Sequence, residues 1–190
     1  MIDDMINGGI FGMIRSGKTT LARKLAWHFW KTKGQRSIYF DPKRDPARNW
    51  FPDCTTIFYD EAPFWDAAWK GTGLVVIADE AAVSIARERE LTPVFTMMNG
   101  RHHRFIVVGH SGTDLLPAMR QQIDYLFLFR QAQEAADMWR KEFPDEQKLV
   151  MEATRLNQFE YLLCRKYVSP EKFYLTKNGK LQVWKMRGAS

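Results

Sequence analysis

The residues best suited to chemistry stand near the start of the sequence, where residues 12–20 read GMIRSGKTT. The spacing of Gly12, Gly17 and Lys18 is typical of a P-loop, a turn that holds phosphate groups. Glycines let the backbone pass close to a phosphate, so that successive N–H groups point at it. Lys18 would reach the β- and γ-phosphates, and the Thr19 hydroxyl would ligate Mg²⁺. We therefore expect ATP and Mg²⁺ to bind through Gly12, Ile14, Arg15, Ser16, Gly17, Lys18, Thr19 and Thr20.

A pair of acidic residues follows a continuous apolar run. Residues 74–78 (LVVIA) favour a strand buried on both faces, and Asp79 and Glu80 come directly after it. An acid at the end of such a strand can hold Mg²⁺ opposite the Thr19 hydroxyl, and a second carboxylate can activate the attacking water as a general base. We therefore expect Thr19 and Asp79 to form the metal site. Lys18 and Glu80 would be catalytic, with Glu80 as the base.

Histidines mark the next candidates. His110 and Ser111 follow the strand predicted at 105–109, at the level where His110 could contact the γ-phosphate or orient water. A hydrogen-bonded strand end or a helix cap is an equally good interpretation of these two residues. His102 and His103 are adjacent, so their side chains point apart and lack the spacing of zinc ligands. This favours a basic surface patch over a metal site.

The elements that must position these residues alternate between strands and helices. A helix from about residue 17 to 34 follows the loop, whereas the strand before it is weak, because only Ile10 and Phe11 are apolar. Further strands are predicted at 37–40, 55–59, 74–78, 105–109 and 125–129, and helices at 60–70, 79–100, 113–122 and 133–142. An outer strand at 159–164 and a hairpin at 173–184, turning at 177–180, would complete the chain. This order predicts an α/β fold with a mainly parallel central sheet flanked by helices.

Length and composition limit the remaining possibilities. A chain of 190 residues suits one domain over 1–190, with a core at about 6–165 and the hairpin within 166–190. The net charge of +6 is compatible with a polyanionic partner such as nucleic acid, without requiring one. No run approaches the roughly 18 apolar residues of a transmembrane helix, so we expect no membrane span.

Taken in order, these motifs resemble the HerA/FtsK superfamily of P-loop ATPases. Residues 38–44 (IYFDPKR) resemble its strand-Asp-Pro-Lys element, and residues 75–80 (VVIADE) resemble its second acidic motif. Residues 100–111 (GRHHRFIVVGHS) resemble its basic segment, strand and polar sensor, although His110 stands where relatives often carry glutamine or asparagine. The small size and the Gly-Arg-His-His segment are similar to the genome-packaging ATPases of membrane-containing, double-jelly-roll double-stranded DNA viruses and phages.

The resemblance implies a ring, expected to be hexameric, that hydrolyses ATP between subunits and moves double-stranded DNA into a capsid without reading its sequence. It implies contacts with the capsid's packaging vertex, and a location in the virion or the host cytoplasm. Arg101 matches the position from which an arginine reaches a neighbour's nucleotide, with Arg104 and Arg120 as rivals. Such a guanidinium would stabilise charge on the γ-phosphoryl oxygens.

Two other classes of function fit parts of the sequence. A small-metabolite P-loop kinase would use the same loop, with Asp41 as the base that acts on a substrate hydroxyl. A nucleotide-dependent assembly or switch protein would bind ATP with negligible turnover. The acidic pair Asp79-Glu80 favours hydrolysis, because activation of water needs a base there, whereas a kinase must exclude water.

Overall fold

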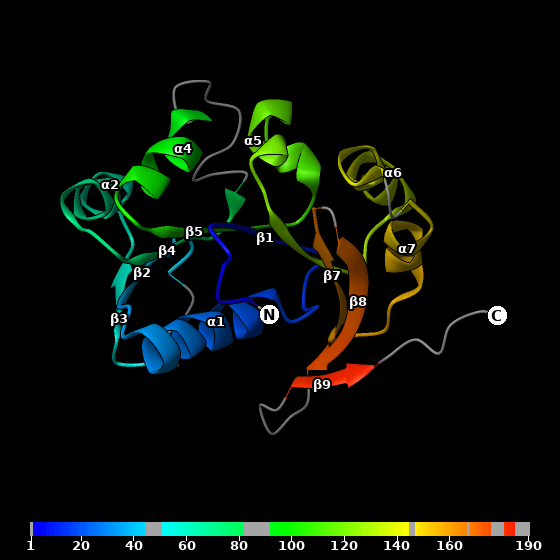
Figure 1. The fold of residues 1–190 in the computed structure, drawn as a ribbon, viewed down its shortest axis with the longest axis horizontal. Helices are drawn as coiled ribbons and strands as arrows, with labels where there is room; N and C mark the ends of the chain where they lie inside the picture. Colours follow the sequence, from blue (N-terminus) through cyan, green and yellow to red (C-terminus); the bar gives the residue numbers. More distant parts are fainter. Residues whose placement is uncertain are drawn as a thin grey trace.

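The strands form one nine-stranded sheet with the order β3-β2-β4-β5-β1-β6-β7-β8-β9 (Figure 1). This computed structural model describes residues 2–44, 51–81, 92–144, 147–166, 168–175 and 181–184. The strands are β1 (Asn7–Phe11), β2 (Ser37–Phe40), β3 (Thr55–Phe58), β4 (Val75–Ala78), β5 (Arg104–Gly109), β6 (Tyr125–Phe129), β7 (Glu160–Arg165), β8 (Val168–Leu175) and β9 (Leu181–Trp184). Strands β1 to β6 pair in parallel, and β7, β8 and β9 extend the sheet in antiparallel fashion.

Helices cover both faces of this sheet. They are α1 (Lys18–Lys33), α2 (Glu61–Lys70), α4 (Thr92–Gly100), α5 (Pro117–Gln121), α6 (Gln133–Glu142) and α7 (Gln147–Glu152), with the 3₁₀ turns η3 (Gly112–Asp114) and η5 (Ala153–Arg155). Figure 1 shows α1 on one side and α2, α4 and α5 on the other. Successive strand residues point to opposite faces, so Ile10 packs in the α1 cluster whereas Phe11 packs with α2 and α4. The predicted α/β architecture is therefore confirmed.

Strand β1, predicted to be weak, lies in the middle of the sheet between β5 and β6 and is buried along its whole length. Its glycines permit this position. A Cβ on Gly8 would lie 2.8 Å from the Met5 sulfur, and one on Gly9 would lie 2.9 Å from Cδ1 of Ile123. The carboxylate of Asp124 accepts hydrogen bonds from the backbone N–H groups of Ile6 and Asn7, at 3.0 and 2.8 Å. The low strand propensity of the glycines is therefore offset by a close approach that larger residues would prevent.

Several predicted bounds differ from the observed ones. The helix predicted at 113–122 is instead η3 followed by the separate helix α5, because Leu115 and Leu116 adopt extended backbone between them. The predicted outer strand is β7, which is not an edge strand, since β8 pairs with it. The predicted hairpin is the β8–β9 pair. Its turn at 177–180 and the part of the predicted 79–100 helix that covers residues 82–91 lie outside the described residues.

Within the described part of the chain, no helix combines the length and the apolar character needed to cross a bilayer.

Candidate nucleotide-binding site

The sheet brings the sequence-predicted residues to one edge. Strands β2, β4, β5 and β1 are parallel neighbours, and the register pairs Phe40 with Ala78 and Phe11 with Gly109. The residues that follow these strands therefore lie side by side. They are Asp41 after β2, Asp79 and Glu80 after β4, His110 after β5 and Gly12 after β1.

The loop after β1 has the conformation that its glycines allow. Gly17 caps α1 with a φ of 110°, in the region that favours glycine. A Cβ on Gly12 would lie 2.4 Å from the Cβ of Phe129, so only glycine fits there. The ammonium of Lys18 donates to the carbonyls of Gly12 and Met13, at 2.7 and 2.9 Å. This lysine therefore lies folded over the loop, at the N-terminal end of a 16-residue helix.

The loop fits a phosphate chain. The Ser16 hydroxyl is buried and makes no hydrogen bond to any described residue, so it remains able to bond a bound anion. The N-terminus of α1 adds a partial positive charge, which favours a phosphate at the same place. Lys18 supplies a full positive charge beside both features.

Asp79 is 3% exposed and is held by two donors. The hydroxyl of Tyr39 on β2 donates to one carboxylate oxygen, and the backbone N–H of Glu80 donates to the other at 2.8 Å. Carboxylate and hydroxyl oxygens are the ligands that Mg²⁺ prefers, and Mg²⁺ in nucleotide sites takes one or two of them together with phosphates. The donor types of Asp79 and Thr19 therefore fit this ion.

Four side chains form a chain of polar contacts beside the loop. Lys18 Nζ lies 3.4 Å from Nδ1 of His110, and Nε2 of His110 lies 3.4 Å from Glu80 Oε2. The other oxygen of Glu80 pairs with Lys43 Nζ at 2.8 Å. Glu80 has a φ of 54°, which a non-glycine residue rarely adopts, and its side chain is only 14% exposed. Such strain clusters at functional sites. A mostly buried, oriented carboxylate that His110 connects to the P-loop lysine is suited to act as a base.

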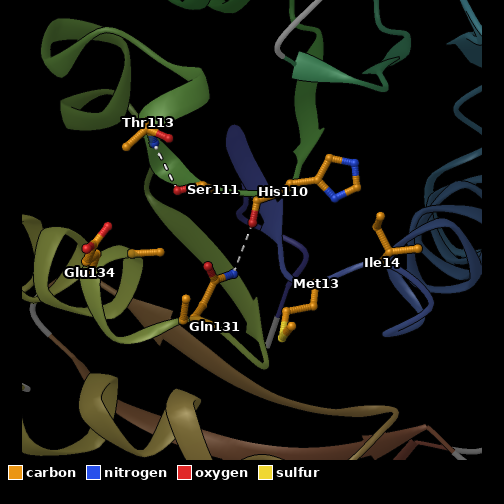
Figure 2. A pocket seen from close by; sticks show the side chains of 9 residues that line it. Met13, Ile14, His110, Ser111, Thr113, Gln131 and Glu134 are labelled. Carbon is orange, nitrogen blue, oxygen red and sulfur yellow. Dashed lines mark hydrogen bonds between the residues drawn. The ribbon is translucent and has the colours of Figure 1, made fainter.

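The backbone at His110 is fixed by the segment that follows it. Ser111 and Asp114 form a capping box around η3, and the Asp114 carboxylate accepts from the N–H groups of His110 and Ser111 at 2.9 and 3.0 Å. Gln131 donates to the His110 carbonyl at 3.4 Å. Figure 2 shows the bond from Gln131 to His110 and the bond from the Thr113 N–H to the Ser111 hydroxyl in a pocket of about 480 Å³, which Met13 also lines. The cap begins at Ser111, which agrees with the helix-cap interpretation of His110 and Ser111.

Lys43 is a site residue that the sequence indicated only as part of the strand-Asp-Pro-Lys element. The Asp41 carboxylate, which is fully buried, accepts from the Lys43 backbone N–H at 3.2 Å, and this turn directs the Lys43 side chain to Glu80. The ion pair of Lys43 with Glu80 could be predicted only if β2 were known to lie beside β4. The spacing of the motifs does not indicate which strands are neighbours.

The candidate arginines lie in different surroundings. Arg101 precedes β5, and its carbonyl accepts from the N–H of Gly73, so it lies at the edge where strands β4 and β5 begin, opposite the P-loop. Arg104 donates to Gln35 at 2.8 Å and to the carbonyls of Asp3 and Met5.

Arg120 is likewise held inside its own chain. It pairs with Glu142 at 3.0 Å and donates to the Leu115 carbonyl at 2.7 Å, and its side chain is 12% exposed. These internal bonds disfavour Arg104 and Arg120 as residues that reach another subunit.

The predicted histidine patch is wrong for one of its members. His102 is exposed, but His103 is buried at 2% exposure. Its Nδ1 accepts from the Leu74 N–H at 2.9 Å, and its Nε2 donates to the Ala68 carbonyl at 3.0 Å. Burial lowers the pKa of His103 below its usual range, so the ring is neutral. His103 therefore links α2 to β4 as a structural residue.

Comparisons with known proteins bear on the fold. No protein-family model matches the sequence, and a search of curated proteins finds no match. Among solved structures, the genome-packaging NTPase B204 of Sulfolobus turreted icosahedral virus 2, in complex with AMPPCP, is 18% identical, with a TM-score of 0.69 over 97% of this chain and 99% of that chain.

Two further solved structures are similar. VirB4 of Thermoanaerobacter pseudethanolicus is 10% identical, with a TM-score of 0.66 over 96% of this chain and 90% of that chain. The pCW3 conjugation coupling protein TcpA, with ATPgS, is 12% identical, with a TM-score of 0.59 over 91% of this chain and 60% of that chain. At these identities the likeness shows the fold alone, which is that of a P-loop NTPase.

Proposed function

We propose that this protein is a viral genome-packaging ATPase, which couples Mg²⁺-dependent hydrolysis of ATP to movement of double-stranded DNA into a capsid. The observation that carries the enzymatic part is the contact chain from Lys18 through His110 to Glu80 and Lys43. This chain supports a role for Glu80 as the base, because it connects the Glu80 carboxylate through His110 to the lysine of the P-loop. The likeness of the fold to the packaging NTPase B204 supports the biological part.

Each residue has a defined role in this proposal. The P-loop backbone and Lys18 bind the phosphates, and Thr19 and Asp79 would hold Mg²⁺, which would supply positive charge to the phosphates. Glu80 accepts a proton from the attacking water. Lys43 and His110 orient the two oxygens of Glu80, so that the base is fixed before the reaction.

The kinase alternative lacks its base. In that reaction Asp41 would have to meet a substrate hydroxyl, but its side chain is fully buried and bonded to the Lys43 backbone. A buried carboxylate that is already used in a turn is poorly suited to accept a proton from a bound metabolite. Hydrolysis of ATP therefore fits this site better than phosphoryl transfer to a small molecule.

The assembly that we propose is a ring, expected to be a hexamer, in which Arg101 reaches the nucleotide of the neighbouring subunit. Arg101 lies at the sheet edge opposite its own P-loop, so it would act on a different subunit. The net charge of +6 is compatible with phosphate contacts that read no sequence. Capsid proteins at the packaging vertex would be the other partners.

Phosphate release measured with and without double-stranded DNA tests both parts of the proposal. We expect Mg²⁺-dependent release of phosphate that rises when DNA is added. Lys18→Ala should abolish it, and Glu80→Gln should slow it by about 10²–10⁴-fold while ATP still binds. Lys70→Ala and Asp66→Asn, which remove an exposed ion pair on α2, are the matched controls and should keep the wild-type rate.

Three results would count against the proposal. Transfer of phosphate to a metabolite would favour a kinase, and tight binding of ATP without turnover would favour a switch protein. Hydrolysis that does not respond to DNA would reject translocation while leaving the ATPase in place.

A further inference from the structure

A pocket of about 410 Å³ adjoins the second half of the P-loop. Its lining consists of Arg15, Ser16, Gly17, Lys18, Thr19, Thr20, Gln158 and Phe159. The last two residues come from the turn that precedes β7, far along the sequence from the loop. No part of the predicted site includes them.

This turn holds an aromatic residue in an unfavourable conformation. Phe159 has a φ of 68° and is 38% exposed. A bulky residue in the left-handed region is a genuine outlier, and such strain persists only where the surroundings impose it. Here the Asn157 backbone N–H and side-chain amide donate to the Glu160 carboxylate at 2.9 and 3.3 Å, and the Glu160 N–H donates to the Asn157 carbonyl at 3.2 Å.

The turn is also fastened to the P-loop itself. The side-chain amide of Gln158 donates to the Arg15 carbonyl at 3.1 Å. Arg15 has a φ of 61°, so both of the segments that meet here carry a non-glycine residue in the left-handed region. Gln158 therefore positions the Phe159 ring relative to the loop.

The direction of a bound nucleotide follows from the other site residues. His110 and Glu80 contact the region of Lys18, which marks the γ-phosphate end. The loop backbone cradles the α- and β-phosphates, so the nucleoside leaves from the opposite end, past Thr19 and Thr20. The pocket that contains Phe159 is also lined by Thr19 and Thr20, the residues that the nucleoside would pass.

We propose that Phe159 is a stacking platform for the base of the bound nucleoside triphosphate. This inference rests on the proposed nucleotide site. A ring that stacks on a base face tolerates any base, because every base has a π-face. The pocket would therefore accept GTP and ATP with similar affinity.

Binding titrations with two probes test this contact. The probes are ATP and inorganic tripolyphosphate, each with Mg²⁺, because tripolyphosphate carries the phosphates without the base. We expect Phe159→Gly to weaken ATP binding about 5- to 100-fold and to leave tripolyphosphate binding unchanged. Phe159→Trp should keep the wild-type affinity for ATP.

The glycine variant also separates stacking from damage to the fold. Glycine adopts the left-handed conformation without strain, so Phe159→Gly should melt at or above the wild-type temperature. Unchanged ATP affinity in this variant would overturn the proposal. An equal loss of affinity for ATP and for tripolyphosphate would also overturn it, because it would mean that the turn only shapes the P-loop. If the wild-type protein binds neither probe, the nucleotide site itself fails, and this inference fails with it.

Discussion

Among single side chains, His110 connects two residues of the candidate site. Its Nδ1 faces the Lys18 ammonium, which can only donate, so Nδ1 is the acceptor and Nε2 carries the proton towards Glu80. The ring is thereby fixed as a bridge between the lysine that would hold the phosphates and the carboxylate that would take the proton. If nucleotide binding changes the contacts of Lys18, the His110 ring would shift and change the position of the Glu80 carboxylate.

His103 provides a prediction about stability and pH. Burial lowers the pKa of His103, whereas in the unfolded chain it titrates near the ordinary value of about 6.5. As the pH falls through that value, His103 binds a proton in the unfolded chain but not in the folded protein. The contribution of His103 to the free energy of unfolding, which is complete above about pH 7, therefore declines. We expect His103→Gln to lower the free energy of unfolding at pH 7.5 by about 1–3 kcal/mol, because it disturbs the bonds to Leu74 and Ala68.

The measurement is the melting temperature at pH 7.5 and at pH 5.5. The melting temperature of His103→Gln should decline less than that of the wild type when the pH is lowered from 7.5 to 5.5. His102→Asn is the control, since His102 is exposed, has a φ of 59°, and asparagine tolerates that conformation. Parallel melting curves for wild type and His103→Gln over this range would refute a buried neutral ring.

At the scale of the elements, β1 depends on residues that have no side chain. We expect Gly9→Ala to lower the free energy of unfolding by about 1–3 kcal/mol, because its Cβ would lie 2.9 Å from both Ile123 and the Phe11 ring. Chemical denaturation measures this loss. Ile123→Val removes one of these two close atoms, Cδ1 of Ile123, so the double variant should recover part of the stability.

Gly100→Ala is the matched control for this substitution, because no atom of a more distant described residue lies within 4 Å of the position that its Cβ would take. It should change the stability by no more than about 0.5 kcal/mol. Equal effects of Gly9→Ala and Gly100→Ala would mean that the close packing of β1 does not limit the fold.

Much of the fold was predictable because the local signals agree with it. The strands at 37–40 and 125–129 and the helix at 133–142 have the predicted bounds, since apolar runs and helical periodicity mark them directly. The P-loop and the acids after β4 were predictable for a similar reason. Their spacing follows from the chemistry of phosphate and Mg²⁺.

The rest depended on which strands are neighbours. The β1 sequence reads as a poor strand, and only its burial between β5 and β6 explains the glycines. The contact of Lys43 with Glu80 requires β2 to lie beside β4. His103 is a histidine like its exposed neighbour in the sequence, and only the buried bonds of its ring to Leu74 and Ala68 distinguish the two.

At the scale of the whole molecule, the candidate nucleotide site and the candidate trans arginine lie at opposite ends of the parallel strands. The P-loop, Glu80 and His110 lie where the parallel strands end, and Arg101 lies where β4 and β5 begin. In a head-to-tail ring, one edge of each subunit meets the opposite edge of the next. This arrangement gives the proposed trans role of Arg101 a geometric basis.

Mixing two inactive variants tests the trans role. Lys18→Ala has no working loop but keeps Arg101, and Arg101→Ala has a working loop but no arginine. In mixed rings some intact loops would face an intact Arg101, so we expect the mixture to hydrolyse ATP although each variant alone is inactive. The rate of phosphate release against the mixing ratio is the measurement.

A matched mixture uses the double variant Lys18→Ala/Arg101→Ala in place of Lys18→Ala, and it should remain inactive. If the first mixture is also inactive while rings still form, Arg101 does not serve a neighbour. If Arg101→Ala alone hydrolyses ATP at the wild-type rate, the residue has no catalytic part at all.

The position of β1 also determines when, during synthesis, the protein can form its nucleotide site. The P-loop follows the first strand, but that strand pairs only with β5 and β6, whose residues are synthesised about a hundred positions later. At ordinary rates of translation this delay is on the order of ten seconds, during which β1 has no neighbouring strand with which to pair. A nascent chain that stops before Tyr125 would carry the complete loop sequence and no nucleotide site.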